Sequence, residues 1–78
     1  MYIVYAISSL NRRYIYVGLT NNVERRFMQH NGGHERTTRP YAPFKLIYTE
    51  TCVTRPEARS REKKLKSGAG KEFLKSLV

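Results

Sequence analysis

The chain has 78 residues, enough for one small domain with a single core. Its 15 Lys and Arg residues against six acidic ones give a formal net charge of +9 and a pI near 10.1, which favours a polyanionic partner, most commonly a nucleic acid. All six acids are Glu and no Asp occurs, so the sequence excludes the carboxylate clusters of two-metal sites, Asp-rich calcium loops and aspartyl dyads.

The apolar content places the chain among folded domains rather than basic tails, since 40% of its residues are hydrophobic and 12% are aromatic. The single cysteine, Cys52, excludes an intramolecular disulfide and a multi-thiolate zinc site, and this is typical of a reducing compartment. The apolar start is too short for a signal peptide, and no run approaches the roughly 18 apolar residues of a membrane span. We therefore predict a cytoplasmic protein with no membrane partner.

The first half of the chain predicts two strands and a helix. Runs of β-branched and aromatic residues at 2–9 and 14–19 are separated by four residues, a spacing typical of a hairpin. One of the two asparagines at 21–22 is expected to cap a helix over 23–31, which the glycines at 32–33 end.

After this helix, residues 32–43 predict a polar loop with room for one helical turn, and residues 44–53 alternate well enough for a third strand. Thr54 then opens a capping box, with Pro in the first turn and Glu three residues after the cap, so we expect a helix over 55–66.

Residues 67–70, Ser-Gly-Ala-Gly, are expected to break that helix, and residues 71–77 to form a terminal one. The order β-β-α-loop-β-α-α predicts an α+β fold, a small sheet flanked by helices, in a single domain over residues 1–78.

Glu62 stands out among the acids because of its place in the 55–66 helix. Ala58, Glu62 and Leu65 follow at i, i+4 and i+7, so the carboxylate lies on the stripe that should face the sheet. The basic side chains beside it are expected to point elsewhere: Arg59, Lys63 and Lys66.

A buried carboxylate requires a partner, because an unpaired charge costs on the order of several kcal/mol. Either Glu62 forms a salt bridge with Arg25, Arg26 or a lysine, or it has a metal-binding or catalytic role. By contrast, three other acids are expected to be ordinary surface or first-turn residues: Glu24, Glu35 and Glu72.

Two further pairs of residues could carry chemistry. Tyr5 and Tyr16 fall on the paired strands, where they form either a packed aromatic pair or a pair of phenols whose pKa is lowered by nearby cations until one can act as a base. Arg26 and His30 are four apart on one helical face, where a guanidinium can bind phosphate and an imidazole can move a proton. The remaining basic residues are expected to be general surface charge, among them Arg12, Arg13, Lys63 and Lys64.

Five segments in order then carry a resemblance: Ile3-Val4-Tyr5, Tyr16-Val17-Gly18, Asn22 to Phe27 with His30, Phe44 to Tyr48, and Glu57 to Lys66. In their order and spacing the chain resembles the GIY-YIG endonuclease superfamily over nearly its whole length. In particular, it is similar to small stand-alone members related to the N-terminal incision module of UvrC-type excision-repair nucleases.

This resemblance implies a three-stranded antiparallel sheet covered by helices, and one divalent cation, Mg²⁺ or Mn²⁺, held by Glu62. It also implies that Tyr16 or Tyr5 activates a water, that the ion stabilises the leaving oxygen, and that Arg26 offsets charge on the phosphoryl group, with His30 beside it. The sequence alone leaves open which tyrosine is the base.

A basic face around these residues is expected to contact nucleic acid, through Gly18, Thr20, Arg25, Arg39, Lys45, Lys63 and Lys66. The chain departs from the family pattern at two places. Ile3 stands where the first motif has Gly, and no Asn follows Glu62, where excision-repair members carry one. Lys66 or Lys71 is the candidate for part of that role, with weak activity as the alternative.

The leading hypothesis is a metal-dependent endonuclease that hydrolyses phosphodiester bonds in DNA, in repair, recombination or DNA turnover. The alternative is a nucleic-acid-binding module with the same basic face and little or no catalysis. The enzyme is favoured because a pure binder has no use for an inward carboxylate that repels phosphate. We expect a monomer with weak sequence preference, acting on plain, branched, flapped or single-stranded DNA, with RNA left open and a partner protein for targeting.

Overall fold

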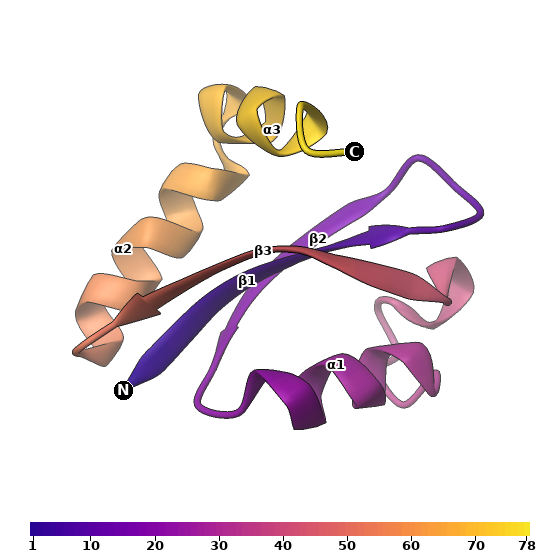
Figure 1. Cartoon of the computed structure of the whole chain (residues 1–78), viewed down its shortest axis with the longest axis horizontal. Helices are drawn as coiled ribbons and strands as arrows, with labels where there is room; N and C mark the ends of the chain where they lie inside the picture. The colour runs from indigo at the N-terminus through magenta and orange to yellow at the C-terminus, as the bar shows by residue number, and fades with distance from the viewer.

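The computed structural model describes all 78 residues and contains a single three-stranded sheet. The strands β1 (Tyr2–Ser9), β2 (Ile15–Thr20) and β3 (Phe44–Cys52) pair antiparallel in the order β2-β1-β3 (Figure 1). The helical elements are α1 (Val23–Asn31), the short 3₁₀ turn η1 (Arg39–Tyr41), α2 (Arg55–Lys66) and α3 (Gly68–Lys75). The predicted α+β class and element order are confirmed.

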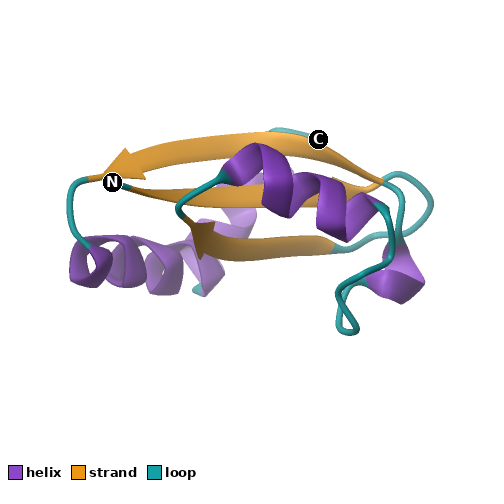
Figure 2. Ribbon diagram, turned by 90° about the horizontal axis from the view of Figure 1, so that it is seen from below, coloured by secondary structure: helices purple, strands orange, loops and turns teal.

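The side chains of β1 alternate between the two faces of the sheet, as the period of a strand requires. Val4 and Ala6 join a core that includes Ala58 and Leu65 of α2, whereas Tyr5 packs in a second cluster on the face covered by α1. Figure 1 shows α1 on one side of the sheet and α2 with α3 on the other, and Figure 2 looks onto the α1 side. A functional site that uses residues of both α1 and α2 must therefore extend across the sheet or around its edge.

The two predicted helix caps are present. The Asn22 side chain accepts a hydrogen bond from the Arg25 backbone N–H at 3.1 Å, and Thr54 Oγ1 accepts one from the Glu57 N–H at 3.3 Å. Helix α1 ends at Asn31, with Gly32 as its C-cap. Each cap satisfies a backbone donor that the first helical turn leaves without a partner. These caps fix where α1 and α2 begin, and hence which side chains face the sheet.

The terminal helix begins earlier than predicted. Ser67 alone separates α2 from α3, because its hydroxyl accepts from the Gly70 N–H at 3.4 Å and so caps a helix that starts at Gly68. Gly70 was expected to be part of the break. It lies instead within the helix, where an added Cβ would overlap the Lys64 carbonyl oxygen, so its missing side chain lets α3 pack directly against α2.

The other differences are small. Strand β2 starts one residue later than predicted, β3 ends one residue earlier, and the helical turn allowed for in the loop is η1. None of the helices is both long enough and apolar enough to cross a membrane.

Candidate functional site

The two motif tyrosines lie together on the α1 face of the sheet. Tyr5 pairs with Gly18 across β1 and β2, and its ring centroid lies 6.3 Å from that of Tyr16. The His30 ring of α1 packs against both, with centroids 5.8 Å from Tyr5 and 5.0 Å from Tyr16. The structure thus brings three of the predicted site residues into one aromatic cluster.

Gly18 makes this cluster possible. A Cβ at this position would lie 2.8 Å from the Tyr5 hydroxyl oxygen and 3.1 Å from a ring carbon of Tyr16. From the sequence, Gly18 was expected to contact nucleic acid. In the structure it is the two phenol rings that occupy the space above Gly18.

A buried chain of hydrogen bonds runs from Tyr5 into the loop after α1. The Tyr5 hydroxyl lies 2.8 Å from His30 Nε2, and His30 Nδ1 lies 2.8 Å from Thr38 Oγ1. The exposed fractions are 1% for Tyr5 and 0% for both His30 and Thr38. Both ring nitrogens of His30 are therefore occupied, and the imidazole is held in one orientation. Thr38 was not identified from the sequence, because this residue lies in an aperiodic loop that folds back against His30 of α1.

Burial and nearby charges set the pKa values of Tyr5 and His30 in this series of hydrogen bonds. Burial raises the pKa of Tyr5 to about 12, with Tyr16 adding to the rise and Arg26 opposing it. Burial also lowers the pKa of His30 below its usual 6.5, and the positive charge of Arg26 lowers it further. The expectation that cations lower the pKa of a motif phenol is therefore wrong for Tyr5, because burial outweighs the nearby Arg26.

Arg26 lies at the edge of this cluster and has partners on its own side of the sheet. Its guanidinium donates to the Glu35 carboxylate at 2.8 Å and to the Gln29 side-chain oxygen at 3.0 Å. Glu35 was predicted to be an ordinary surface acid. It is partly buried and holds Arg26, so any phosphate that reaches Arg26 competes with this carboxylate.

Glu62 lies on α2, which packs on the opposite face of the sheet from His30. Its burial is as predicted, with 6% of the residue exposed. Of the predicted salt-bridge partners, a lysine is confirmed, whereas Arg25 and Arg26 do not pair with Glu62. One carboxylate oxygen lies 3.1 Å from Arg59 Nη1 and the other 3.4 Å from Lys66 Nζ. Arg59 and Lys66 were expected to point elsewhere. They are one turn from Glu62 at i−3 and i+4, so their long side chains can fold back over the carboxylate.

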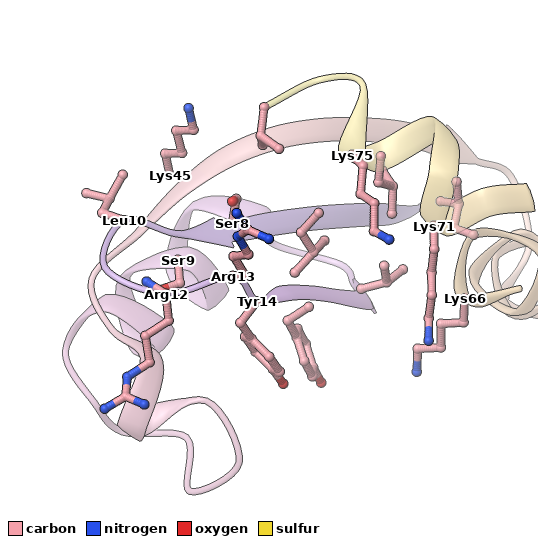
Figure 3. A pocket seen from close by; sticks show the side chains of 16 residues that line it. Ser8, Ser9, Leu10, Arg12, Arg13, Tyr14, Lys45, Lys66, Lys71 and Lys75 are labelled. Carbon is pink, nitrogen blue, oxygen red and sulfur yellow. The ribbon is translucent and has the colours of Figure 1, made fainter. Parts of the chain in front are cut away.

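A groove that we call the basic groove runs between the β1–β2 turn and helices α2 and α3 (Figure 3). It has a volume of about 1070 Å³, and both Tyr16 and Lys66 line it. It carries six cations and no acidic side chain: Arg12, Arg13, Lys45, Lys66, Lys71 and Lys75. Because Lys66 also pairs with Glu62, the groove connects the neighbourhood of the carboxylate with the aromatic cluster.

Comparison with known proteins identifies the family of the chain. A family model described as the GIY-YIG catalytic domain matches residues 1–74. The chain belongs to the GIY-YIG family. The resemblance predicted from the motifs is confirmed, and the family is one of nucleases, which act on nucleic acids and generally use a divalent metal ion.

The relatives of the chain are UPF0213 proteins. One from Halobacterium salinarum is 39% identical over 77 residues, covering 95% of this chain and 99% of the relative. Another, from Desulfotalea psychrophila, is 43% identical over 54 residues, covering 67% of this chain, which spans only 49% of that relative's length. The solution NMR structure of a UPF0213 protein from Bacillus halodurans matches with a TM-score of 0.57 and 33% identity, over 99% of this chain and 85% of that one.

Glu62 is the one carboxylate that the resemblance assigned to the metal ion. No group of three or more His, Cys, Asp and Glu residues that could hold a metal ion is present, and Glu62 is the candidate ligand. Mg²⁺ in phosphate chemistry keeps several waters and takes one or two carboxylates plus substrate phosphates. Arg59 and Lys66 are 54% and 52% exposed, so they can swing off the carboxylate. Glu62 would hold such an ion, which would supply positive charge to a bound phosphate.

The residues predicted to contact nucleic acid do not form one surface. Lys45 and Lys66 line the basic groove, whereas Lys63 is exposed on α2 outside it. Thr20 accepts from the Asn22 N–H next to the α1 cap, and Arg39 donates to the Gly33 carbonyl oxygen. Arg25 lies in a shallow depression beside α1. The groove also contains four cations that the sequence prediction did not include: Arg12, Arg13, Lys71 and Lys75.

Proposed function

We propose that this chain is a divalent-metal-dependent endonuclease that hydrolyses phosphodiester bonds in DNA, in repair, recombination or DNA turnover. One observation carries the proposal: a motif phenol, Tyr16, and the cation paired with the inward carboxylate, Lys66, line the same acid-free basic groove. A polyanion in that groove meets a candidate base and lies close to a candidate metal ligand.

Tyr16 is our choice for the base: after its hydroxyl has lost its proton to solvent, the phenolate takes a proton from the attacking water. Its side chain is partly exposed and borders the groove, so water and substrate can reach the hydroxyl. Tyr5 is a poor candidate, because it is 1% exposed and its pKa of about 12 keeps it protonated near neutral pH.

Tyr5, His30 and Thr38 act in this proposal as positioning residues. Their chain of two hydrogen bonds fixes the His30 ring, which packs 5.0 Å from the Tyr16 ring between centroids. A base held by a rigid buried neighbour loses little entropy on reaching the reactive geometry. Loss of any link would therefore loosen Tyr16.

Arg26 is our candidate for binding the phosphoryl oxygens. Its guanidinium is partly exposed and charged at every physiological pH. A phosphate can replace Glu35, which accepts from Nη2 alone, and bind the guanidinium through two N–H groups. Since the charge on these oxygens grows toward the transition state, a fixed cation beside them lowers the barrier.

Glu62 is our candidate metal ligand, and an ion held there would supply charge stabilisation for the leaving oxygen. For Glu62 to serve, Arg59 and Lys66 have to release its oxygens, and both are attached by flexible, half-exposed side chains. Lys66 released from Glu62 remains on the groove, where it can pair with a substrate phosphate.

The test is a nicking assay on supercoiled plasmid with Mg²⁺ or Mn²⁺, extended to single-stranded, flapped and RNA substrates. Glu62→Gln keeps the size of the side chain and removes its charge. Glu72→Gln is the matched control, because the Glu72 side chain is 76% exposed and does not itself line the groove. We expect wild type and Glu72→Gln to cleave and Glu62→Gln to be inactive. Full activity of Glu62→Gln would overturn the assignment of Glu62.

The alternative function is a nucleic-acid-binding module with little or no catalysis. It is favoured by the double ion pairing of Glu62 and by the absence of an Asn after it. Salt-dependent binding by a wild-type protein that cleaves none of these substrates with either metal would establish this alternative.

A further inference from the structure

The basic groove includes a surface that the proposed chemistry does not use. Lys71 and Lys75 come from α3, Arg12 from the β1–β2 turn and Lys45 from β3, and no step at Tyr16, Arg26 or Glu62 requires them. Figure 3 shows Lys45 at one end of the groove and Lys66 at the other, with Lys71 and Lys75 along the α3 side. The cations therefore follow the length of the groove rather than forming one cluster.

Few acidic side chains of the protein neutralise the positive charge of the basic groove. No acidic residue lines the groove, and the only carboxylates that pair with its cations are Glu62, which holds Lys66, and the exposed Glu72, 3.6 Å from Lys75. An exposed pair of this kind contributes about 0–1 kcal/mol and is easily exchanged. Like charges along a groove repel one another, and an extended polyanion relieves that repulsion.

A hydroxyl at the same place also lacks a partner. Ser8 is 7% exposed, lies on the α3 face of β1 and lines the groove, and it makes no side-chain hydrogen bond within the chain. Since no fully buried polar side-chain atom is left without a hydrogen bond, its oxygen is reachable from the groove. A serine hydroxyl among Lys and Arg side chains is a common contact to backbone phosphate.

The base of this groove is preformed. The Ser9 hydroxyl accepts from the backbone N–H groups of Asn11 and Arg12 at 3.3 and 3.1 Å, which fixes the β1–β2 turn. On the other side, α3 is held close to α2 by the contact at Gly70. Its cations are thus presented from rigid elements, so little ordering is needed when a ligand binds.

We propose that the basic groove binds the sugar-phosphate backbone of the nucleic acid beyond the phosphate at Tyr16, with Lys71, Lys75 and Ser8 contacting successive phosphates. The ligand is the nuclease substrate, because Tyr16, the proposed base, lines the groove. In this respect the inference rests on the proposed function. The α3 groove surface then sets affinity and register, while Tyr16, Arg26 and Glu62 supply the chemistry.

The experiment is fluorescence anisotropy with a labelled 20-nucleotide DNA, single-stranded or duplex, in EDTA so that binding is measured without cleavage. The test variant is Lys71→Gln/Lys75→Gln, which removes two groove cations at exposed helical positions. The matched control is Arg36→Gln/Lys64→Gln, which removes the same charge at exposed positions outside the groove. Affinity is measured from low to high salt.

Each phosphate contact in a single strand changes log K by about −0.7 per unit of log salt, so losing two contacts lowers the slope by about 1.4 and weakens binding about 25-fold at 0.1 M salt. We expect this loss in the Lys71/Lys75 variant and a much smaller one in the control. Equal losses in the two variants would overturn the groove proposal, as would polyglutamate of the same charge binding as tightly as DNA.

The outcome is separable from that of the proposed function. A wild-type protein that cleaves nothing, while the Lys71/Lys75 variant still loses binding, would refute the nuclease and keep the groove. Cleavage by wild type, together with unchanged DNA binding by the Lys71/Lys75 variant, would support the nuclease and refute the groove proposal.

Discussion

The hydroxyl of Thr38 is predicted to stabilise the whole cluster behind Tyr16. Replacing it in Thr38→Val keeps the shape of the side chain and removes only the group that lies 2.8 Å from His30 Nδ1. Thr38 precedes η1, but its side chain makes no capping hydrogen bond there, so the substitution removes no helix cap. Any effect therefore reports the bond to His30.

The size of the effect follows from burial. Thr38 and His30 are both 0% exposed, so no water can replace the lost partner. Leaving a buried polar atom unsatisfied costs about 1–3 kcal/mol. In a domain of this size each kcal/mol of lost stability lowers Tm by about 4–8 °C, so we expect a drop of at least about 4 °C.

The assay is urea unfolding followed by circular dichroism, together with thermal melting. Thr37→Val is the matched control, because the neighbouring Thr37 is exposed. Thr38→Ser, which restores the hydroxyl, should recover cleavage activity even though it loses a methyl group. Equal stability of the Thr38→Val and Thr37→Val proteins would refute the claim that Thr38 holds His30.

Three further results are expected. Gly18→Ala should cost about 1–3 kcal/mol in urea unfolding and lower cleavage, because its Cβ would lie 2.8 Å from the buried Tyr5 hydroxyl oxygen; a neutral effect would contradict the packing described. The pKa of His30 in the folded protein lies below 6.5, so the unfolded chain binds more protons as the pH falls. The free energy of unfolding should therefore be at its full value above about pH 6.5 and decrease as the pH drops through the folded pKa, by up to about 1.4 kcal/mol per pH unit. The variant His34→Gln should keep this pH dependence, and His30→Gln should lose it. EDTA should abolish cleavage without weakening DNA binding. Cleavage that continues in EDTA would refute the requirement for a divalent metal ion.

Local patterns predicted most of the fold. The strand alternation of β1, the asparagine and threonine caps and the i, i+4, i+7 stripe of α2 each depend on neighbours in sequence, and each is present. The start of α3 was wrong because Ser67 acts as a cap and Gly70 as a contact point between helices, which a breaker-rich sequence does not distinguish from a loop.

The site was less predictable because its parts come from distant segments. Thr38 and Glu35 lie in an aperiodic loop, and only the folding of that loop against α1 brings them to His30 and Arg26. The basic groove draws its six cations from the β1–β2 turn, β3, α2 and α3, so no stretch of sequence carries its signature. For Glu62 a lysine partner was among the predicted alternatives, whereas Arg59 was not. Both Arg59 and Lys66 were expected to point elsewhere, because helical phase places the Cα of each residue but not the reach of its flexible side chain.

The central claim is that Tyr16, rather than Tyr5, acts as the base of a nuclease. The direct measurement is the single-turnover rate of plasmid nicking by Tyr16→Phe and Tyr5→Phe, at saturating protein and below the melting temperature of both variants. A general base contributes about 10²- to 10⁴-fold, so we predict a loss of that size for Tyr16→Phe and a smaller one for Tyr5→Phe. A Tyr16→Phe protein that nicks at the wild-type rate would contradict the account.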